Sequence, residues 1–379
     1  MSDVWYYCRE CGRRVAADGT DWRCTCGGPL DLPARSGFSR DLIDAAEPSL
    51  WRYRAGLWGL GVPQRTWFGE GLTPLVKRPW AGLSLRFKVE GMMPTGSFKD
   101  RGAAVLIHHL ANLGVQEILE DSSGNGGAAI AAYAAAAGIR CHIYVPEQTS
   151  TGKITQLKAS GANVRRIPGN REATSEAAIR DAERWVYASH NWQPMFIEGV
   201  KTVAYEIWEQ LDFKVPEAIV LPVSYGSNLL GLYRGFNELL RANEIDQIPR
   251  LYAAQAANVA PLHHFSQHGT LDLDPKPTVA EGIAGTHPIR IKEMLEAVTV
   301  SGGRTIPVEE KTIIPNLIAF ASTTGLYVEP TSAVAIAAAE VLANSGEIGE
   351  DTVVLLTGGG LKATERITSE LSRVEGAKA

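Results

Sequence analysis

From about residue 85 onward, short apolar runs alternate with longer segments that have an apolar face. Runs such as residues 218–223 and 352–357 are bounded by turn residues, which predicts buried strands. The longer segments between the runs predict helices. Strands that alternate with helices form parallel sheets covered by helices, so the pattern predicts an α/β fold. Ligands of such sheets bind beyond the carboxyl ends of the strands.

The individual elements follow from this pattern. The predicted strands are residues 85–90, 117–123, 141–146, 163–169, 218–223 and 352–357. The predicted helices are residues 97–114, 126–138, 152–161, 175–188 and 229–243.

Composition narrows the class of protein. The chain has 379 residues, 45% of them hydrophobic and 21% charged, with a formal net charge of -5. These values are typical of globular proteins, and the acidic balance does not favour nucleic acid or an anionic membrane as partner. The first residues do not resemble a signal peptide, and no apolar run approaches the length of a membrane span. We therefore expect a cytoplasmic protein without nucleic-acid or membrane partners.

The string PTGSFKDRG, residues 94–102, places Lys99 at the predicted start of a helix with Ser97 as its N-cap. The positive end of the helix dipole disfavours the ammonium form of the lysine, and the backbone holds its stem. A lysine that forms an imine with a carbonyl compound needs both properties. Taken alone, the same string is also typical of an ordinary charged helix start.

The string SSGNGG, residues 122–127, lies between a predicted strand and an Ala-rich helix. Backbone amides and small hydroxyls at a helix N-terminus bind anions, so Ser122, Ser123 and Gly124 are candidates to hold a carboxylate. The amide of Asn125 can donate a hydrogen bond to a phenolic oxygen. The alternative is a plain strand-to-helix turn that uses glycine for its geometry.

Two further glycine-containing strings follow apolar strands. In SYGSNLLG, residues 224–231, the backbone amides of four residues can cradle a phosphate: Gly226, Ser227, Asn228 and Leu229. The string matches neither the P-loop nor the dinucleotide pattern, so those ligands are not indicated. In LLTGGGLK, residues 355–362, Thr357 puts a hydroxyl at a strand end, and the glycines let the backbone approach a flat ring.

Four of the five cysteines lie within the first 26 residues, as Cys8, Cys11, Cys24 and Cys26. Four thiolates in two close pairs suit a tetrahedral structural zinc site of the ribbon type. A metal-free vestige and a redox pair are the alternatives. The fifth, Cys141, is predicted to be an ordinary strand residue.

Together and in this order, the four Gly-rich and lysine motifs resemble those of the fold-type II pyridoxal phosphate enzymes, and within them the threonine synthase group. The resemblance runs from about Gly69 to Lys362. It also includes the strings GEGLTPL, GKITQLKASGA, IEGVKTVAYEI, TVAEGIA and GLYVEPTSA. It implies two doubly wound α/β domains of the tryptophan synthase β-like type, and a homodimer. We assign residues 1–33 to a zinc-ribbon-like module, residues 34–104 and 197–379 to a large pyridoxal-phosphate-binding domain, and residues 105–196 to a small α/β domain.

The resemblance also implies a role for each motif. Lys99 is then the Schiff-base lysine and the proton shuttle, and Asn125 contacts the ring hydroxyl of the cofactor. Thr357 faces the pyridine nitrogen. The phosphate lies on residues 226–229, and the substrate carboxylate lies on residues 122–124.

The chain departs from the threonine synthase pattern where that group is expected to bind the substrate's phosphate. Met93 and Gln193 each replace an asparagine, Phe196 replaces an arginine, and Gly126 replaces a threonine. A buried dianion needs charge-assisted donors, so the loss of the arginine indicates that O-phosphohomoserine binds poorly. The candidates for a different side-chain pocket are His190, Trp192 and Gln193; alternatively, these three simply pack a loop. Lys153 and Phe196 are the further candidates to contact the substrate.

The sequence therefore predicts a pyridoxal-phosphate-dependent elimination or replacement enzyme that acts on a small, O-activated amino acid. Because Thr357 carries a hydroxyl and not a carboxylate, it cannot hold a proton on the ring nitrogen by charge pairing, which favours loss of a β-leaving group. Threonine synthase proper, an amino-acid dehydratase or ammonia-lyase, and a cysteate synthase-like β-replacing enzyme remain as alternatives. A non-enzymatic zinc-ribbon binding protein is the most distant alternative.

Overall fold

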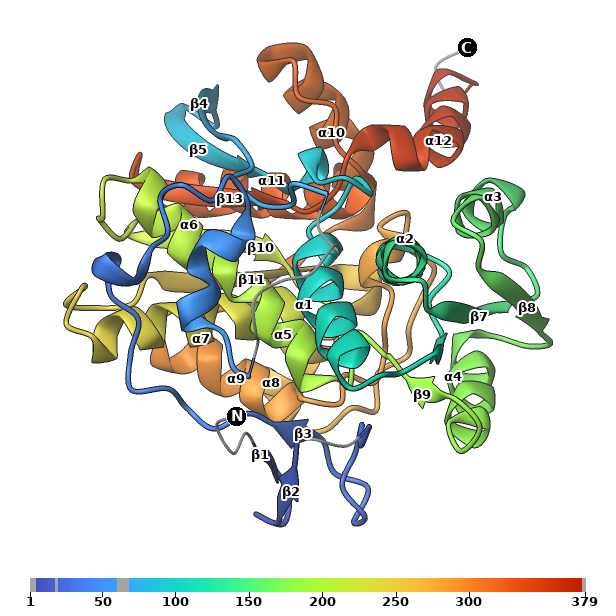
Figure 1. The fold of residues 1–379 in the computed structure, drawn as a ribbon. Helices are drawn as coiled ribbons and strands as arrows, with labels where there is room; N and C mark the ends of the chain where they lie inside the picture. The colour runs from blue at the N-terminus through green and yellow to red at the C-terminus, as the bar shows by residue number, and fades with distance from the viewer. Residues whose placement is uncertain (1–4, 18–19, 60–67, 377–379) are drawn as a thin grey trace. The chain divides into compact units, whose positions relative to one another are not determined.

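The computed structural model describes residues 5–17, 20–59 and 68–376, with side chains described up to residue 372 (Figure 1). The sequence also predicts a linker-like stretch from residue 34 to about Trp67, and residues 60–67 of this stretch lie outside the described residues. The chain divides into two compact units, Met1–Leu72 with Lys99–Thr202, and Thr73–Phe98 with Val203–Ala379. Our sequence-based boundaries put residues 34–72 with the second of these units, and they stay a prediction.

The first unit contains a four-stranded parallel sheet in the order β8-β7-β6-β9. Its strands are β6 (Glu117–Glu120), β7 (Arg140–Pro146), β8 (Asn163–Ile167) and β9 (Val186–Tyr187). The chain adds β7 and β8 on one side of β6, and then returns to add β9 on the other side. The loops that follow β6 and β9 therefore leave neighbouring strands at the same sheet edge, at a topological switch point.

Helices connect these strands and surround the sheet. They are α1 (Lys99–Asn112), α2 (Asn125–Ala137), α3 (Thr151–Ala159), α4 (Arg171–Asp181) and α5 (Pro194–Val200). The predicted helix over residues 175–188 was wrong in its limits. Asn170 caps α4 by accepting a hydrogen bond from the amide of Ala173, so the helix begins earlier. Residues 186–187 pair with β6 as a strand instead.

The N-cap predicted at Ser97 was also wrong. The helix α1 begins at Lys99, so Ser97 lies before the cap position. Its hydroxyl is fully buried and makes no hydrogen bond within the described residues, while its backbone bridges to Gly358. The orphaned hydroxyl is a polar group that a ligand can satisfy.

The second unit contains a six-stranded sheet in the order β12-β11-β10-β13-β5-β4. Only the edge strand β4 is antiparallel to its neighbour. The strands are β4 (Leu75–Trp80), β5 (Leu83–Val89), β10 (Ala218–Pro222), β11 (Arg250–Ala256), β12 (Thr305–Val308) and β13 (Thr352–Leu356). Here too the order reverses beside one strand, because β11 lies on one side of β10 and β13 on the other. The loops after β10 and β13 thus leave neighbouring strands at one edge.

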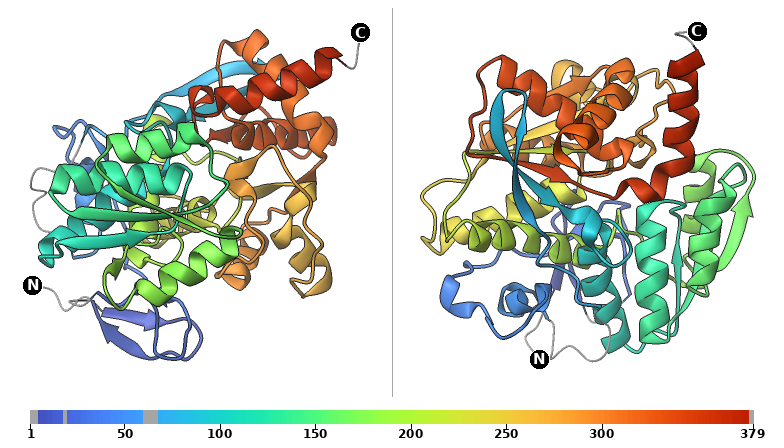
Figure 2. Two further views of the ribbon diagram at one scale, coloured as in Figure 1. Left: turned by 90° about the vertical axis from the view of Figure 1, so that its right-hand side faces the viewer. Right: turned by 90° about the horizontal axis from the view of Figure 1, so that it is seen from above.

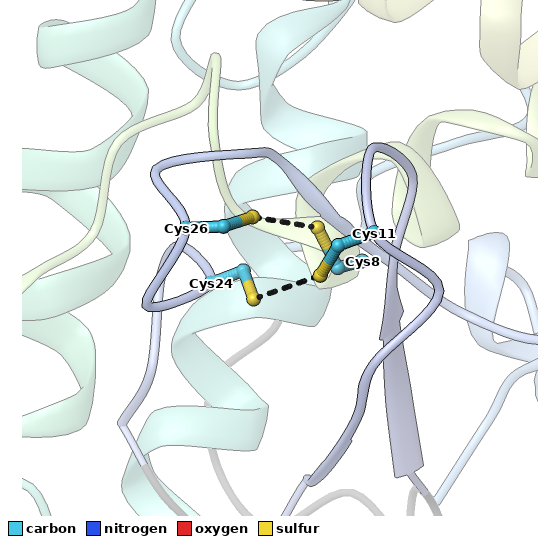
Figure 3. Close-up of side chains that lie close together, drawn as sticks. All are labelled: Cys8, Cys11, Cys24 and Cys26. Carbon is cyan, nitrogen blue, oxygen red and sulfur yellow. Dashed lines mark hydrogen bonds between the residues drawn. The ribbon is translucent and has the colours of Figure 1, made fainter.

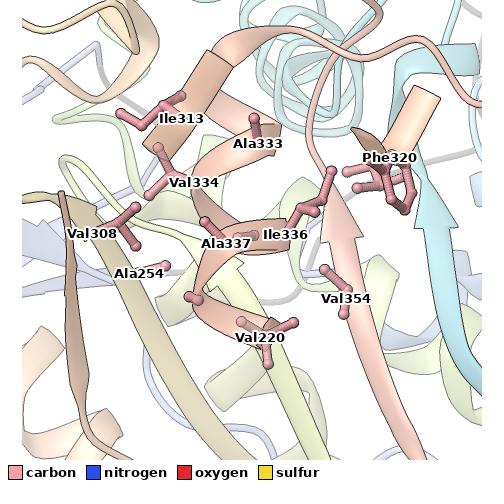
Figure 4. Close-up of a cluster of buried hydrophobic side chains, with 14 of the residues drawn as sticks. Val220, Ala254, Val308, Ile313, Phe320, Ala333, Val334, Ile336, Ala337 and Val354 are labelled. Atoms are coloured by element: carbon pink, nitrogen blue, oxygen red, sulfur yellow. The ribbon is translucent and has the colours of Figure 1, made fainter. Parts of the chain in front are cut away.

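The core of this unit lies between the sheet and α11 (Pro330–Asn344), an Ala-rich helix that contacts β10, β11 and β13. Figure 4 shows Val220, Ala254 and Val354 of the three strands facing this helix. Small side chains let the helix approach the sheet closely, and the apolar contact stabilises both. The other helices are α6 (Thr202–Gln210), α7 (Ser227–Arg241), α8 (Pro261–His268), α9 (Ile291–Val300), α10 (Glu310–Thr324) and α12 (Thr364–Gly376).

The N-terminal segment forms a small antiparallel sheet in the order β2-β1-β3, seen at the blue end of the chain in Figure 2, left. Its strands are β1 (Trp5–Cys8), β2 (Arg14–Ala16) and β3 (Leu30–Asp31). Short 3-10 helices cover Arg40–Leu42, Leu50–Gly56, Glu90–Met92, Ala257–Val259, Glu281–Ile283 and Gly360–Ala363. Among the helices of the described ranges, none combines the length and the hydropathy needed to cross a bilayer.

Candidate active site

In the first unit, the switch point brings together the loop after β6, which carries Ser122–Asn125, and the loop after β9, which carries His190 and Gln193. The closest approach is at Gly126 in the first turn of α2. A Cβ atom added there would lie 2.8 Å from the ring of His190. A threonine at this position would therefore displace the histidine, so Gly126 and His190 depend on each other.

His190 is held by a buried carboxylate that the sequence analysis missed. Its Nδ1 lies 2.9 Å from Glu120 Oε1, and its backbone amide donates to Glu120 Oε2 at 3.1 Å. Burial raises the pKa of Glu120 to about 7. Burial, followed by the positive charges of Lys99 and Arg171, holds the pKa of His190 well below its usual value. The imidazole is therefore neutral near neutral pH. The signal for Glu120 in the sequence was a charged residue at the end of an apolar strand, separated from SSGNGG only by Asp121.

Lys99 is the first residue of α1, and its Nζ lies 5.5 Å from the centre of the Phe196 ring. That ring is fully buried, and a Cβ atom added to Gly102 would lie 2.5 Å from it. The centres of the Phe196 and His190 rings are 5.8 Å apart. An aromatic ring thus lies near both the lysine and the histidine, at the position where the resemblance leads us to expect an arginine.

The remaining candidates of this unit have different surroundings. Ser122 is buried, and its Oγ accepts a hydrogen bond from the amide of Gly124, which shapes the loop. Gln193 is buried and donates from its side-chain amide to the carbonyl of Tyr187 at 2.7 Å, which ties its own loop to β9. Lys153 is half-buried near the start of α3.

In the second unit, Gly226 ends the turn after β10 and is the N-cap of α7. Its φ of 87° lies in the left-handed region, and a Cβ atom there would lie 2.6 Å from the side chain of Met294. The first amides of a helix have no partner inside it, and the ladder of α7 begins with Leu230 donating to Gly226. Both polar atoms of the Asn228 side chain are buried without a hydrogen bond in the described structure. This donor set suits an anion with several oxygen atoms.

Thr357 follows β13 and is buried. Its hydroxyl donates to Glu329 Oε1 at 3.0 Å and lies 3.2 Å from the hydroxyl of Ser332. Its carbonyl accepts a hydrogen bond from the amide of Phe98 at 3.0 Å. Because Phe98 directly precedes Lys99 in the chain, this bond fixes the backbone next to the lysine. Glu329 and Ser332 belong to the string GLYVEPTSA, to which the sequence analysis gave no role.

The four N-terminal cysteines come together as expected, and Figure 3 shows their sulfur atoms facing one another. All four sulfur atoms lie within 4.8 Å of one another. Cys8 and Cys26 are 3.4 Å apart, and Cys11 and Cys24 are 3.7 Å apart. Four cysteine sulfur atoms this close to one another fit the donor set of a structural zinc site.

Comparison with known proteins agrees with these motifs. The sequence matches the family model described as pyridoxal-phosphate dependent enzyme over residues 66–358. The threonine synthase of Methanocaldococcus jannaschii is 31% identical, over 97% of this chain and 96% of the relative. That of Methanosarcina acetivorans is 34% identical, over 93% of this chain and 91% of the relative. The structure of maize serine racemase has the same fold, with a TM-score of 0.66 at 22% identity, and the match covers 81% of this chain and 94% of the racemase.

The chain therefore belongs to the family of pyridoxal-phosphate-dependent enzymes and has their fold-type II architecture. Within this family it belongs to the threonine synthase-like group, as the motifs indicated. It is an enzyme of the elimination or replacement type with pyridoxal phosphate as its cofactor.

The pair of Glu120 and His190 predicts an unusual pH dependence of stability. The raised pKa of Glu120 means that its contribution to the free energy of unfolding falls as pH rises from about 4.5 to about 7. The lowered pKa of His190 means that its contribution falls as pH drops below 6.5. In the intact pair the two slopes oppose each other.

We expect single variants to separate the two slopes. Relative to the intact protein, Glu120→Gln loses stability toward low pH, and His190→Gln loses stability toward neutral pH, by up to about 1.4 kcal/mol per pH unit. Denaturant unfolding between about pH 5 and 7 measures both differences, in the window set by these two pKa shifts. Stability differences that do not change with pH would contradict the raised pKa of Glu120 and the lowered pKa of His190.

Proposed function

We propose that this enzyme binds pyridoxal phosphate covalently through Lys99 and removes or replaces the β-substituent of a small amino acid. The observation that carries the proposal is the position of Lys99. It opens α1 directly after Phe98, whose backbone is bonded to Thr357 at the end of β13. The lysine thus directly follows a backbone position that is hydrogen-bonded to the end of a buried strand, and a covalent cofactor site requires such support.

The chain offers a suitable partner for each polar part of the cofactor. The amides of residues 226–229 and the orphaned side chain of Asn228 suit the phosphate. Thr357 is assigned to the ring nitrogen, to which its hydroxyl donates by turning away from Glu329 when the cofactor is bound. Asn125, the first residue of α2, is assigned to the ring hydroxyl.

When bound, the cofactor withdraws electrons from the Cα atom of an amino acid and makes its proton acidic. In our proposal, Lys99 takes and returns that proton, because it is the base nearest to the bond that breaks. Ser122, Ser123 and Gly124 hold the substrate carboxylate at the N-terminus of α2, where the helix dipole favours an anion.

The surroundings of the lysine favour a substrate side chain without a phosphate. Phe196 supplies no cation, and the nearby Glu120 is an acid with a buried carboxyl. Lys153 and Gln193 remain assigned to this pocket by our proposal. Threonine synthase activity is the second candidate, because relatives at 31% and 34% identity carry that name.

A panel of amino acids tests the proposal. We expect the highest kcat/KM with a β-substituted amino acid such as L-serine, L-threonine, O-acetyl-L-serine or diaminopropionate. Loss of one charge-assisted donor from a buried site lowers phosphohomoserine binding about a hundredfold. Steady-state kinetics with products identified by mass spectrometry provide the values, and Lys99→Ala provides the inactive control. Threonine formed from phosphohomoserine with the highest kcat/KM of the panel would establish threonine synthase proper instead.

We further propose that Cys8, Cys11, Cys24 and Cys26 bind one structural zinc ion. Four thiolates leave no open coordination position, so the ion supports the fold of the N-terminal segment and takes no part in catalysis. A homodimer and a cytoplasmic location stay predictions from the sequence.

Elemental analysis and thermal unfolding test the zinc site. Protein purified without chelator is expected to contain about one zinc ion per chain. Cys8→Ser should lose the ion and unfold at lower temperature, because metal binding and folding are coupled. The absorption of the bound cofactor should stay unchanged. Cys141→Ser is the matched control and should keep the zinc; intact protein without zinc would refute the site.

A further inference from the structure

His190 has one ring nitrogen without a partner in the described structure. Its Nδ1 and its backbone amide are both engaged by Glu120. Its Nε2 makes no hydrogen bond to any described residue, and 8% of the side chain is open to solvent. The hydrogen bond at Nδ1 fixes the orientation and the tautomer of the imidazole ring. The Nε2 atom can therefore form a hydrogen bond to a ligand.

The His190 ring lies near the residues that we assign to the substrate carboxylate and near Phe196, which Lys99 contacts. The ring packs against Gly126, which closely follows residues 122–124, our candidates for the substrate carboxylate. The centre of the ring is also 5.8 Å from that of Phe196, and the Nζ of Lys99 lies 5.5 Å from the Phe196 ring. In the proposed site, two substituents of the substrate's Cα atom have assigned partners: the carboxylate on residues 122–124 and the proton on Lys99. A residue near both partners is in a position to contact a further substituent, the side chain.

We infer that His190 binds the β-substituent of the substrate through Nε2 and donates the proton that the leaving oxygen or nitrogen acquires. The inference rests on the proposed function and deepens it, since it defines the substrate class. The substituent is a neutral hydrogen-bonding group such as a hydroxyl, a group that leaves poorly unless it is protonated.

The step is balanced within the pair of His190 and Glu120. The bond between Cβ and the leaving oxygen breaks, and its electron pair goes to the oxygen. That oxygen takes the proton from Nε2, while Nδ1 takes the proton of the Glu120 carboxyl group. The pair ends as a carboxylate and a neutral imidazole. The proton that Lys99 removed from Cα restores the pair by way of solvent after the product has left.

The charges around the pair agree with this role. Burial raises the pKa of Glu120 to about 7, so the carboxyl group still carries its proton over much of the range below neutrality. The charged groups that face the pair are Lys99, Asp121 and Arg171. A phosphate leaving group needs no such donor, and its charge would be repelled by the carboxylate that remains. His190, Glu120 and the absence of an arginine at position 196 thus all favour substrates with a neutral β-substituent over substrates with a phosphate.

Leaving groups of different basicity separate a proton donor from a residue that only packs the loop. L-serine loses a hydroxyl, which needs a proton, whereas β-chloro-L-alanine loses chloride, which needs none. The experiment compares kcat/KM for pyruvate formation from both in the holoenzyme and in His190→Gln. The binding of L-serine and L-alanine, measured from the change in cofactor absorption immediately after mixing, adds a readout that precedes turnover.

Glu117→Gln is the matched control, because Glu117 lies on the same strand and pairs with another histidine, His142, at 3.0 Å. This pair lies outside the proposed site, so the control should behave as the intact enzyme with both substrates.

We expect His190→Gln to lower kcat/KM for L-serine about a hundredfold or more and to change that for β-chloro-L-alanine less than about threefold. The dissociation constant should rise about tenfold for L-serine, by the loss of one hydrogen bond, and stay unchanged for L-alanine. An equal fall with both substrates, or no fall with either, would overturn the inference while the proposed function stands. A wild-type enzyme that acts on no β-substituted amino acid would overturn both.

A second variant covers the case in which His190→Gln does not fold. Glu120→Gln keeps an acceptor oxygen for the backbone amide of His190 and an N–H donor for Nδ1, but it has no proton to transfer. It should reproduce the selective loss with L-serine and remove the fall of that rate above about pH 7. An unchanged pH profile with full L-serine activity would contradict the role of the pair.

Discussion

The reversal of strand order in the four-stranded and in the six-stranded sheet is the constraint on which the rest of the structure depends. In the first unit the reversal lies at β6 and β9, and in the second unit it lies at β10 and β13. At such a point the two loops diverge from neighbouring strands and leave room for a ligand. The residues assigned to the carboxylate and to the leaving group follow β6 and β9. Those assigned to the phosphate and to the ring nitrogen follow β10 and β13.

Close packing then makes the departures from the threonine synthase pattern depend on one another. His190 occupies space that a side chain at position 126 would need, and Phe196 occupies space that a side chain at position 102 would need. A change of Gly126 alone to threonine would therefore clash with the His190 ring. Glu120 belongs to the same arrangement. Burying a neutral histidine and a carboxyl group that are hydrogen-bonded to each other costs less free energy than burying either group without a partner.

Much of this arrangement could be predicted from the sequence. The Gly-rich strings predicted that Lys99, Asn125, residues 226–229 and Thr357 lie at strand ends or helix starts, because each of these motifs is local in the chain. The bond between His190 and Glu120 could not be predicted, since the two residues are 70 positions apart and meet only through the order of the strands. The same limit explains β9: Val186–Tyr187 follows a helical pattern directly and becomes a strand because β6 offers a free edge. Serine is a residue type that often caps helices, but the backbone of Ser97 pairs with Gly358, so Ser97 lies before the start of the helix.

The central claim is that Lys99 carries the cofactor, and chemical fixation tests it most directly. Sodium borohydride converts a reversible bond between a lysine and pyridoxal phosphate into a stable amine, which mass spectrometry of the digested protein can assign to one residue. The account predicts the added phosphopyridoxyl mass on the peptide that contains Lys99, and on no other lysine. The label on Lys153 or Lys362 instead, or a bound cofactor that leaves no label on Lys99, would contradict it.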